Sequence, residues 1–176
     1  MRRLRYSVAA SLDGYIAGPN GEYDWIVMDP DIDFPAMYSE FDTLLMGRKT
    51  YEVMRAMGDE AGPALGVSWV VVSRTMRAAD HPAVTIVTDA ERAATELKAR
   101  PGEKDVWLFG GGALFRTLLA AGLVDTVEVA VIPVLLGGGI PLLPLPAPRA
   151  RLQLTSHRLY ERSGIVFVVY DVVREK

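Results

Sequence analysis

Three segments of the sequence carry residue types suited to binding phosphate groups. In the first, Gly110, Gly111 and Gly112 separate the apolar run 106–109 from a helical pattern. Glycines lack β-carbons and let a ligand approach the backbone, and a helix start offers unpaired N–H groups and a positive dipole end. A glycine triplet alone is equally consistent with a tight turn between two packed elements. The triplet therefore indicates a phosphate site only if residues from elsewhere in the chain lie beside it.

The other two segments follow apolar, strand-like runs. Residues 43–46 lead into Gly47, Arg48, Lys49 and Thr50, and residues 68–72 lead into Ser73, Arg74 and Thr75. The carboxyl ends of parallel strands lie along one edge of a sheet, so the three segments are expected to converge there. Two guanidinium groups, several hydroxyls and two helix N-termini suit a pyrophosphate plus one further phosphate. This combination favours NADPH over NADH.

Other readings of these residues have less support. No Gly-Lys-Ser/Thr follows the triplet, so the Walker pattern fails, and Phe115 occupies the last glycine position of the G-x-G-x-x-G fingerprint. Spacing reveals no Ser-His-Asp set and no pair of catalytic carboxylates. The chain has no cysteine and only two histidines, which argues against a metal site.

Composition limits the class of protein. The 176 residues are 50% hydrophobic and 23% charged, which predicts a single domain over 1–176. The net charge of −3 argues against nucleic-acid binding. The basic N-terminus does not fit a signal peptide, and no stretch approaches the ~18 apolar residues of a membrane span. We therefore expect a soluble cytoplasmic protein.

Periodicity predicts about eight strands and four helices. A short helix carries Phe34, Met37, Tyr38 and Phe41 on one face. A second helix begins at Tyr51, capped by Thr50, and ends near Gly58. The predicted strands are 4–10, 43–46, 68–73, 84–87, 106–109, 126–131, 152–160 and 165–173; the other helices lie within 90–97 and 114–119; and 13–25 and 134–148 are expected as loops. Strands alternating with helices, closed by a terminal hairpin, indicate an α/β fold with a largely parallel sheet, a C-terminal antiparallel hairpin and helices on both faces.

These landmarks, in this order, resemble a dihydrofolate reductase-like fold. The similarity is to the reductase domain of riboflavin biosynthesis, the RibD C-terminal domain family, and to its stand-alone bacterial members. The matching segments are Ser11-Leu12-Asp13-Gly14-Tyr15-Ile16-Ala17, Leu45-Met46-Gly47-Arg48-Lys49-Thr50-Tyr51-Glu52, Val72-Ser73-Arg74-Thr75, Leu108-Phe109-Gly110-Gly111-Gly112 and Ile132-Pro133-Val134-Leu135-Leu136-Gly137-Gly138-Gly139.

The resemblance implies NADPH as cofactor, hydride transfer as the reaction and, for the riboflavin-type members, a homodimer. The cofactor residues that it implies are Ala10, Ile16 and Ala17 beside the nicotinamide; Gly47, Arg48, Lys49, Thr50, Ser73, Arg74 and Thr75 around the adenosine phosphates; and Phe109, Gly110, Gly111, Gly112, Ala113 and Leu114 at the pyrophosphate.

The substrate is left open between three hypotheses. The first is a reductase of a small heterocyclic or carbonyl-like substrate, such as a pterin or flavin precursor. The second is dihydrofolate reductase itself, whose members carry an acidic residue near the first helix; Asp31 and Asp33 are the candidates, and N-capping is the alternative role for Asp33. The third is a non-catalytic flavin- or nucleotide-binding module in which Trp25, Tyr51 and Trp107 stack on a ring. Trp25 and Tyr51 are the substrate-site candidates.

An uncharged apolar segment predicts self-association. Residues 134–145 are rich in Leu, Ile and Pro, which would form an unusually apolar surface if left uncovered. We expect a homodimer interface to cover it.

Overall fold

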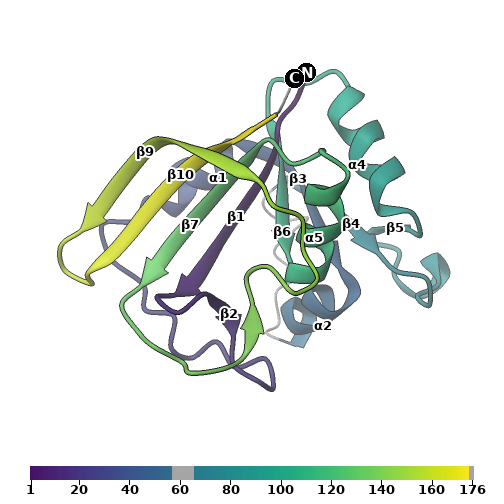
Figure 1. The fold of residues 1–176 in the computed structure, drawn as a ribbon. Helices are drawn as coiled ribbons and strands as arrows, with labels where there is room; N and C mark the ends of the chain where they lie inside the picture. The colour runs from purple at the N-terminus through teal and green to yellow at the C-terminus, as the bar shows by residue number, and fades with distance from the viewer. Residues whose placement is uncertain (57–65, 175–176) are drawn as a thin grey trace.

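The computed structural model describes residues 1–56 and 66–174, which build an eight-stranded sheet and a separate two-stranded ribbon (Figure 1). The strand order of the large sheet is β5-β4-β3-β6-β1-β7-β10-β9. Its strands are β1 (Leu4–Ser11), β3 (Phe41–Gly47), β4 (Ser68–Val72), β5 (Thr85–Val87), β6 (Asp105–Gly110), β7 (Thr126–Ile132), β9 (Arg151–Tyr160) and β10 (Ile165–Val173). Neighbouring strands from β5 to β7 run parallel, while β10 is antiparallel to both β7 and β9.

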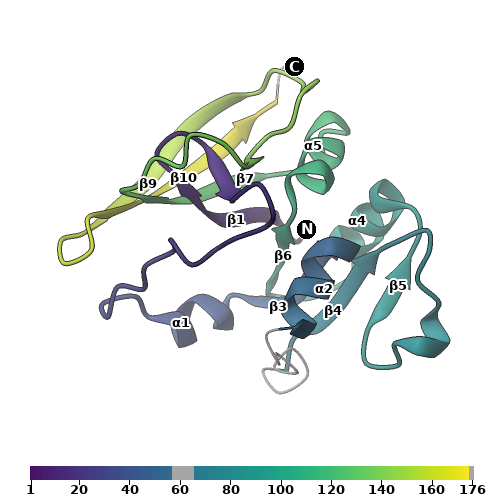
Figure 2. The same ribbon diagram turned by 90° about the horizontal axis from the view of Figure 1, so that it is seen from below.

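Helices cover both faces of the sheet (Figure 2). Helices α4 (Ala90–Ala99) and α5 (Gly112–Ala120) pack on one face through a cluster that includes Leu97 and Phe115. Helices α1 (Phe34–Ser39) and α2 (Arg48–Ala56) pack on the other, where Tyr51 and Trp107 belong to a second cluster. A 3-10 turn, η1, spans Ala78–Asp80. The predicted fold class is confirmed.

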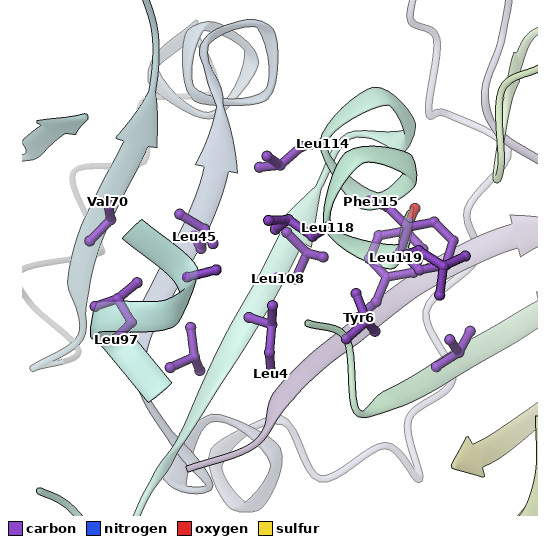
Figure 3. Packing of buried hydrophobic residues seen from close by; sticks show 14 of the residues in the cluster. Leu4, Tyr6, Leu45, Val70, Leu97, Leu108, Leu114, Phe115, Leu118 and Leu119 are labelled. Atoms are coloured by element: carbon purple, nitrogen blue, oxygen red, sulfur yellow. The ribbon is translucent and has the colours of Figure 1, made fainter. Parts of the chain in front are cut away.

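The first cluster explains why residues 112–120 form a helix on the sheet. The apolar side chains of the predicted stripe, Leu114, Phe115, Leu118 and Leu119, are all buried. The Phe115 ring stacks on Tyr6 of β1 with centroids 3.9 Å apart (Figure 3). Gly122, with φ +67°, follows the end of α5 in the backbone region that favours glycine. These contacts hold the start of α5 beside the end of β6.

Several local predictions were wrong. Phe41, expected on the face of the first helix, is instead the first residue of β3, because α1 ends at Ser39. Thr50 does not cap a helix from Tyr51, because β3 runs directly into α2 and the helix already begins at Arg48. The segments expected as loops contain β2 (Tyr15–Ala17) and β8 (Ile140–Pro141), which pair antiparallel. Strands of two or three residues are too short for an alternating pattern to identify. The predicted helix end at Gly58 lies outside the described residues.

No helix of the described ranges is both long and apolar enough to cross a membrane.

Candidate cofactor site at the carboxyl edge of the sheet

The three segments predicted to bind phosphate groups meet at one edge of the sheet. Strand β3 lies between β4 and β6, with Gly47 beside Val72 and Met46 beside Gly110 in the parallel register. Parallel neighbours end at the same edge, so the segments that follow these strands are adjacent in space. The ends of β1 and β7 continue the same edge, with Ser11 beside Ile132.

The glycine triplet joins β6 to α5 and contacts α2. Gly110 has φ +144°, a conformation that side chains rarely adopt. Cβ atoms built on Gly110 and Gly111 would lie 3.6 and 3.5 Å from Oγ1 of Thr50, in ordinary contact. Thr50 therefore faces the triplet from the first turn of α2 instead of capping that helix.

The third glycine has a different environment from the one expected of a ligand cradle. A Cβ on Gly112 would lie 2.7 Å from the carbonyl oxygen of Pro141 and 2.9 Å from Cδ of Pro144. Position 112 thus needs glycine because the chain packs against it there. The N-cap of α5 is Gly111, which has no side chain to bond the first N–H groups of the helix. An anion can take that place.

Basic and hydroxyl side chains surround this edge. Arg48, Lys49 and Arg74 are exposed, and Arg48 Nη1 lies 3.6 Å from Oε1 of Glu52. Buried Ser73 shapes the second segment, since its Oγ accepts hydrogen bonds from the backbone N–H groups of Thr75 at 3.2 Å and Met76 at 3.1 Å. This serine turn holds Arg74 and Thr75 at the end of β4.

Residues predicted to lie beside the nicotinamide come from β1 and β2. Ala10 is buried near the end of β1, and Ile16 and Ala17 are half-buried in β2. Phe109 is half-buried at the end of β6, and the Leu114 side chain is buried in the core. The cofactor roles of all these residues stay predictions.

The two candidate acids, Asp31 and Asp33, make different kinds of contact. Asp33 caps α1, because its Oδ1 accepts a hydrogen bond from the Ala36 N–H at 2.9 Å. This matches the capping role considered for it. Asp31 is exposed, and its carbonyl oxygen accepts a hydrogen bond from Nη2 of Arg158 at 3.3 Å.

A third aspartate in this segment, Asp29, was not predicted from the sequence to have a role. It is only 2% exposed, and its carboxylate accepts hydrogen bonds from the N–H groups of Asp31 and Ser163, both at 2.9 Å. These bonds tie the connection before α1 to the turn between β9 and β10. The side chain of Ser163 is the largest cause that lowers the pKa of Asp29 below its usual value, and the N–H groups of Asp31 and Ser163 and the charge of Arg162 lower it further.

Replacing Asp29 with Asn should reduce the loss of stability in acid. Because the folded-state pKa is lowered, ionised Asp29 stabilises the fold above the ordinary aspartate pKa, and this stabilisation disappears as the pH falls through the folded value. Thermal unfolding from pH 6 to pH 2.5 measures the effect. Asp29→Asn should have the lower Tm at pH 6 and a flatter decline below pH 4, whereas Asp24→Asn, on an exposed residue of the same segment, should follow the wild type. Equal slopes for all three proteins would contradict the assignment.

The aromatic candidates for substrate stacking are held by other contacts. Tyr51 is buried; its ring meets Trp69 edge-on at 6.2 Å, and its hydroxyl lies 3.2 Å from Nδ1 of His81. Trp107 is also buried and donates a hydrogen bond from Nε1 to the Ser7 carbonyl at 2.8 Å. Both act as core residues. Trp25 is half-buried, and its Nε1 donates to the Glu22 carbonyl at 3.0 Å.

The parallel sheet, the terminal antiparallel hairpin and the loops gathered at one edge define a dihydrofolate reductase-like α/β protein. Within that class, the chain belongs to the RibD C-terminal domain family, whose model matches residues 2–166. Both the family resemblance and the fold predicted from the sequence are confirmed.

Two relatives from Bacillus subtilis (strain 168) carry the names of uncharacterized proteins. YyaP is 36% identical over 179 residues, covering 96% of this chain and 94% of the relative. YwjB is 29% identical over 144 residues, covering 80% of this chain and 82% of the relative.

Solved structures reproduce the fold over the whole chain. A putative riboflavin biosynthesis protein from Shewanella sp. PV-4 superposes with a TM-score of 0.82 at 24% identity, covering 99% of this chain and 100% of that one. A pyrimidine reductase-like protein from Corynebacterium diphtheriae gives 0.69 at 15% identity, covering 99% and 93%. A deaminase and 5-amino-6-(5-phosphoribosylamino)uracil reductase from Thermotoga maritima gives 0.71 at 15%, covering 98% of this chain and 57% of that protein.

Proposed function

We propose that this protein is an NADPH-dependent reductase that transfers a hydride to a small heterocyclic or carbonyl-like substrate of the pterin or flavin-precursor kind. The observation that carries the proposal is the meeting of three loops and the starts of α2 and α5 at one sheet edge. Membership of the RibD C-terminal domain family supports it, as do the reductase names of two structural neighbours.

The residues of this edge fit the groups of NADPH. Arg48, Lys49 and Arg74 supply positive charge for the adenosine phosphates, and the uncapped start of α5 supplies N–H donors for the pyrophosphate. Gly47 leaves room beside them, since a Cβ there would have, among the described residues, only the Gly110 carbonyl oxygen as neighbour, at 4.0 Å. When bound, NADPH supplies the hydride from its nicotinamide ring.

Calorimetric titration with NADPH and NADH tests the proposal. NADPH should bind with a Kd in the micromolar range, and NADH should bind at least about tenfold more weakly, because it lacks the phosphate that the guanidinium groups recognise. Absence of binding by either nucleotide would overturn the proposal. Oxidation of NADPH with a panel of pyrimidines, pterins and dihydrofolate would then identify the substrate class.

We also propose that the protein is a homodimer that buries exposed apolar residues of β9, the strand at one side of the sheet. Strand β9 is exposed along nearly its whole length, and Leu152, Leu154 and Leu159 are 44%, 50% and 56% exposed. The register places them on the same sheet face as Val168 and Val172, which pack on the core. The apolar surface thus continues outward from the core. Within residues 134–145, Leu135 and Leu145 are also exposed, whereas Leu142 and Leu143 pack on the core.

Sedimentation at micromolar concentration should give twice the chain mass of 19.3 kDa. The double variant Leu154→Glu/Leu159→Glu should be a folded monomer, because two buried charges without partners oppose association. Val53→Glu, at a 41% exposed position on α2, is the matched control and should stay dimeric. A monomeric wild type would contradict the proposal, and a dimeric double variant would show that the interface lies elsewhere.

A further inference from the structure

We infer that Asp13 is a positioning residue of the cofactor site, holding the segment 134–144 between the β1–β2 turn and the glycine triplet. This inference rests on the proposed NADPH site. The carboxylate of Asp13 accepts hydrogen bonds from three donors: Oγ of Ser11 at 2.6 Å and the N–H groups of Leu136 at 3.1 Å and Gly137 at 2.7 Å. These bonds connect the turn after β1 to the chain after β7.

The same turn has further contacts with this segment. The Leu12 N–H donates to the Val134 carbonyl, and the Leu142 N–H donates to the Gly14 carbonyl, both at 2.9 Å. The Ser11 hydroxyl that donates to Asp13 also accepts a hydrogen bond from the Tyr15 N–H at 3.0 Å. The carboxylate therefore lies at the centre of a network that fixes both strands of the β2–β8 ribbon.

Beyond Gly137 the segment passes very close to β2. A Cβ on Gly139 would lie 2.2 Å from the Ala17 carbonyl oxygen, and Gly139 has φ +146°. Ala17 then pairs with Ile140 in the β2–β8 ribbon. Contact this close leaves the segment little freedom once its start is fixed at Leu136 and Gly137.

The segment next reaches the pyrophosphate side of the site. The Pro141 carbonyl oxygen and Pro144 ring are the groups that a Cβ on Gly112 would meet, and Gly112 is the first residue of α5. One continuous segment therefore contacts β2, predicted to lie at the nicotinamide, and the start of α5, predicted to lie at the pyrophosphate. Asp13 holds the beginning of this segment. The distance between the predicted nicotinamide position and the predicted pyrophosphate position therefore depends on one carboxylate.

Asp13→Asn tests the inference, because the amide nitrogen cannot accept the N–H donors that a carboxylate oxygen accepts. Hydrogen exchange followed by mass spectrometry should show exchange in residues 134–141 at least about tenfold faster than in the wild type. The Kd for NADPH should rise about five- to tenfold, because binding must then order the loosened segment. Asp24→Asn removes one exposed carboxylate from the neighbouring connection and should change neither value.

A double-mutant cycle separates positioning from general loosening. Gly112→Ala perturbs the far end of the same segment, so its effect on the Kd should be less than multiplicative with that of Asp13→Asn. Multiplicative effects would overturn the inference, as would unchanged exchange in Asp13→Asn. Ser11→Ala, which keeps the carboxylate, should shift exchange in the same direction by less and serves as the second variant if Asp13→Asn does not fold.

Failure of the proposed function gives a different result. A wild type that binds no NADPH but whose segment 134–141 is protected by Asp13 would overturn the cofactor assignment and leave the anchor confirmed. A wild type that binds NADPH as tightly as Asp13→Asn would overturn the positioning role and leave the cofactor assignment intact.

Discussion

Glu128→Ala should lower the free energy of unfolding by about 3 kcal/mol, the loss expected when one partner of a buried ion pair is removed. The Glu128 side chain is only 3% exposed at the centre of β7 and pairs with Arg5 of β1, whose side chain is 18% exposed. Burial by itself lowers the pKa of Arg5, but the hydrogen bond and charge attraction of Glu128, followed by those of Glu40, raise it above the ordinary arginine value. Without Glu128, the guanidinium is left in a desolvated position with the more exposed carboxylates of Glu40 and Asp105 as its partners. Urea unfolding at pH 7 measures the difference.

The same arginine offers a matched control. Glu40 also pairs with Arg5, but its side chain is 52% exposed. Glu40→Ala should therefore cost no more than about 0.5 kcal/mol, as for a surface ion pair. The double variant Arg5→Met/Glu128→Leu should recover most of the lost stability, because it removes both buried charges together. Equal losses for Glu128→Ala and Glu40→Ala would show that burial of the pair has no energetic consequence.

The sequence predicted the sheet and helices well where the hydrophobic pattern is long. Strand β1 and helix α5 each carry a sustained apolar stripe that ends up in the core, at Leu4 and Tyr6 in one and at Leu114 and Leu118 in the other. Strands β2 and β8 were missed because their pairing is specified by contacts distant in sequence, such as Tyr15 with Pro141. A pattern of two or three residues contains no periodicity that could reveal them.

The meeting of the three segments at one sheet edge was predicted, but the contacts among their residues were not. The position of Arg48 and Arg74 at one edge could be predicted because neighbouring parallel strands end at the same edge of a sheet. The packing of Pro141 against Gly112 was not foreseen, since a glycine needed for a close approach has the same sequence signature as one that admits a ligand. The long-range contacts of Asp13 and Asp29 were not predicted for a related reason: they are made to backbone N–H groups, which no residue type in the sequence marks.

The double variant Arg48→Ala/Arg74→Ala should weaken NADPH binding about 100-fold, with about tenfold from each residue. A charge-assisted hydrogen bond to a phosphate contributes roughly 1.5 kcal/mol, which is about a factor of ten in Kd. Both side chains are exposed at the edge where β3 and β4 end, so removing them leaves no buried group unpaired. The Tm without nucleotide should therefore change little. Titration calorimetry and thermal unfolding with and without NADPH measure the two effects separately.

The preference between nucleotides distinguishes a specific phosphate contact from general electrostatic attraction. If either guanidinium binds the phosphate that NADH lacks, NADH affinity should fall less than NADPH affinity, and the preference for NADPH should shrink. Arg77→Ala is the matched control, because Arg77 lies three residues after Arg74 and pairs with Asp80 in the same connection. It removes the same charge and should leave both affinities within about twofold of wild type, because its guanidinium is already paired with Asp80 at 3.0 Å and salt screens exposed charges. Equal losses for Arg74→Ala and Arg77→Ala would mean that net charge attracts the nucleotide, and the 2′-phosphate site would have to lie elsewhere on the edge.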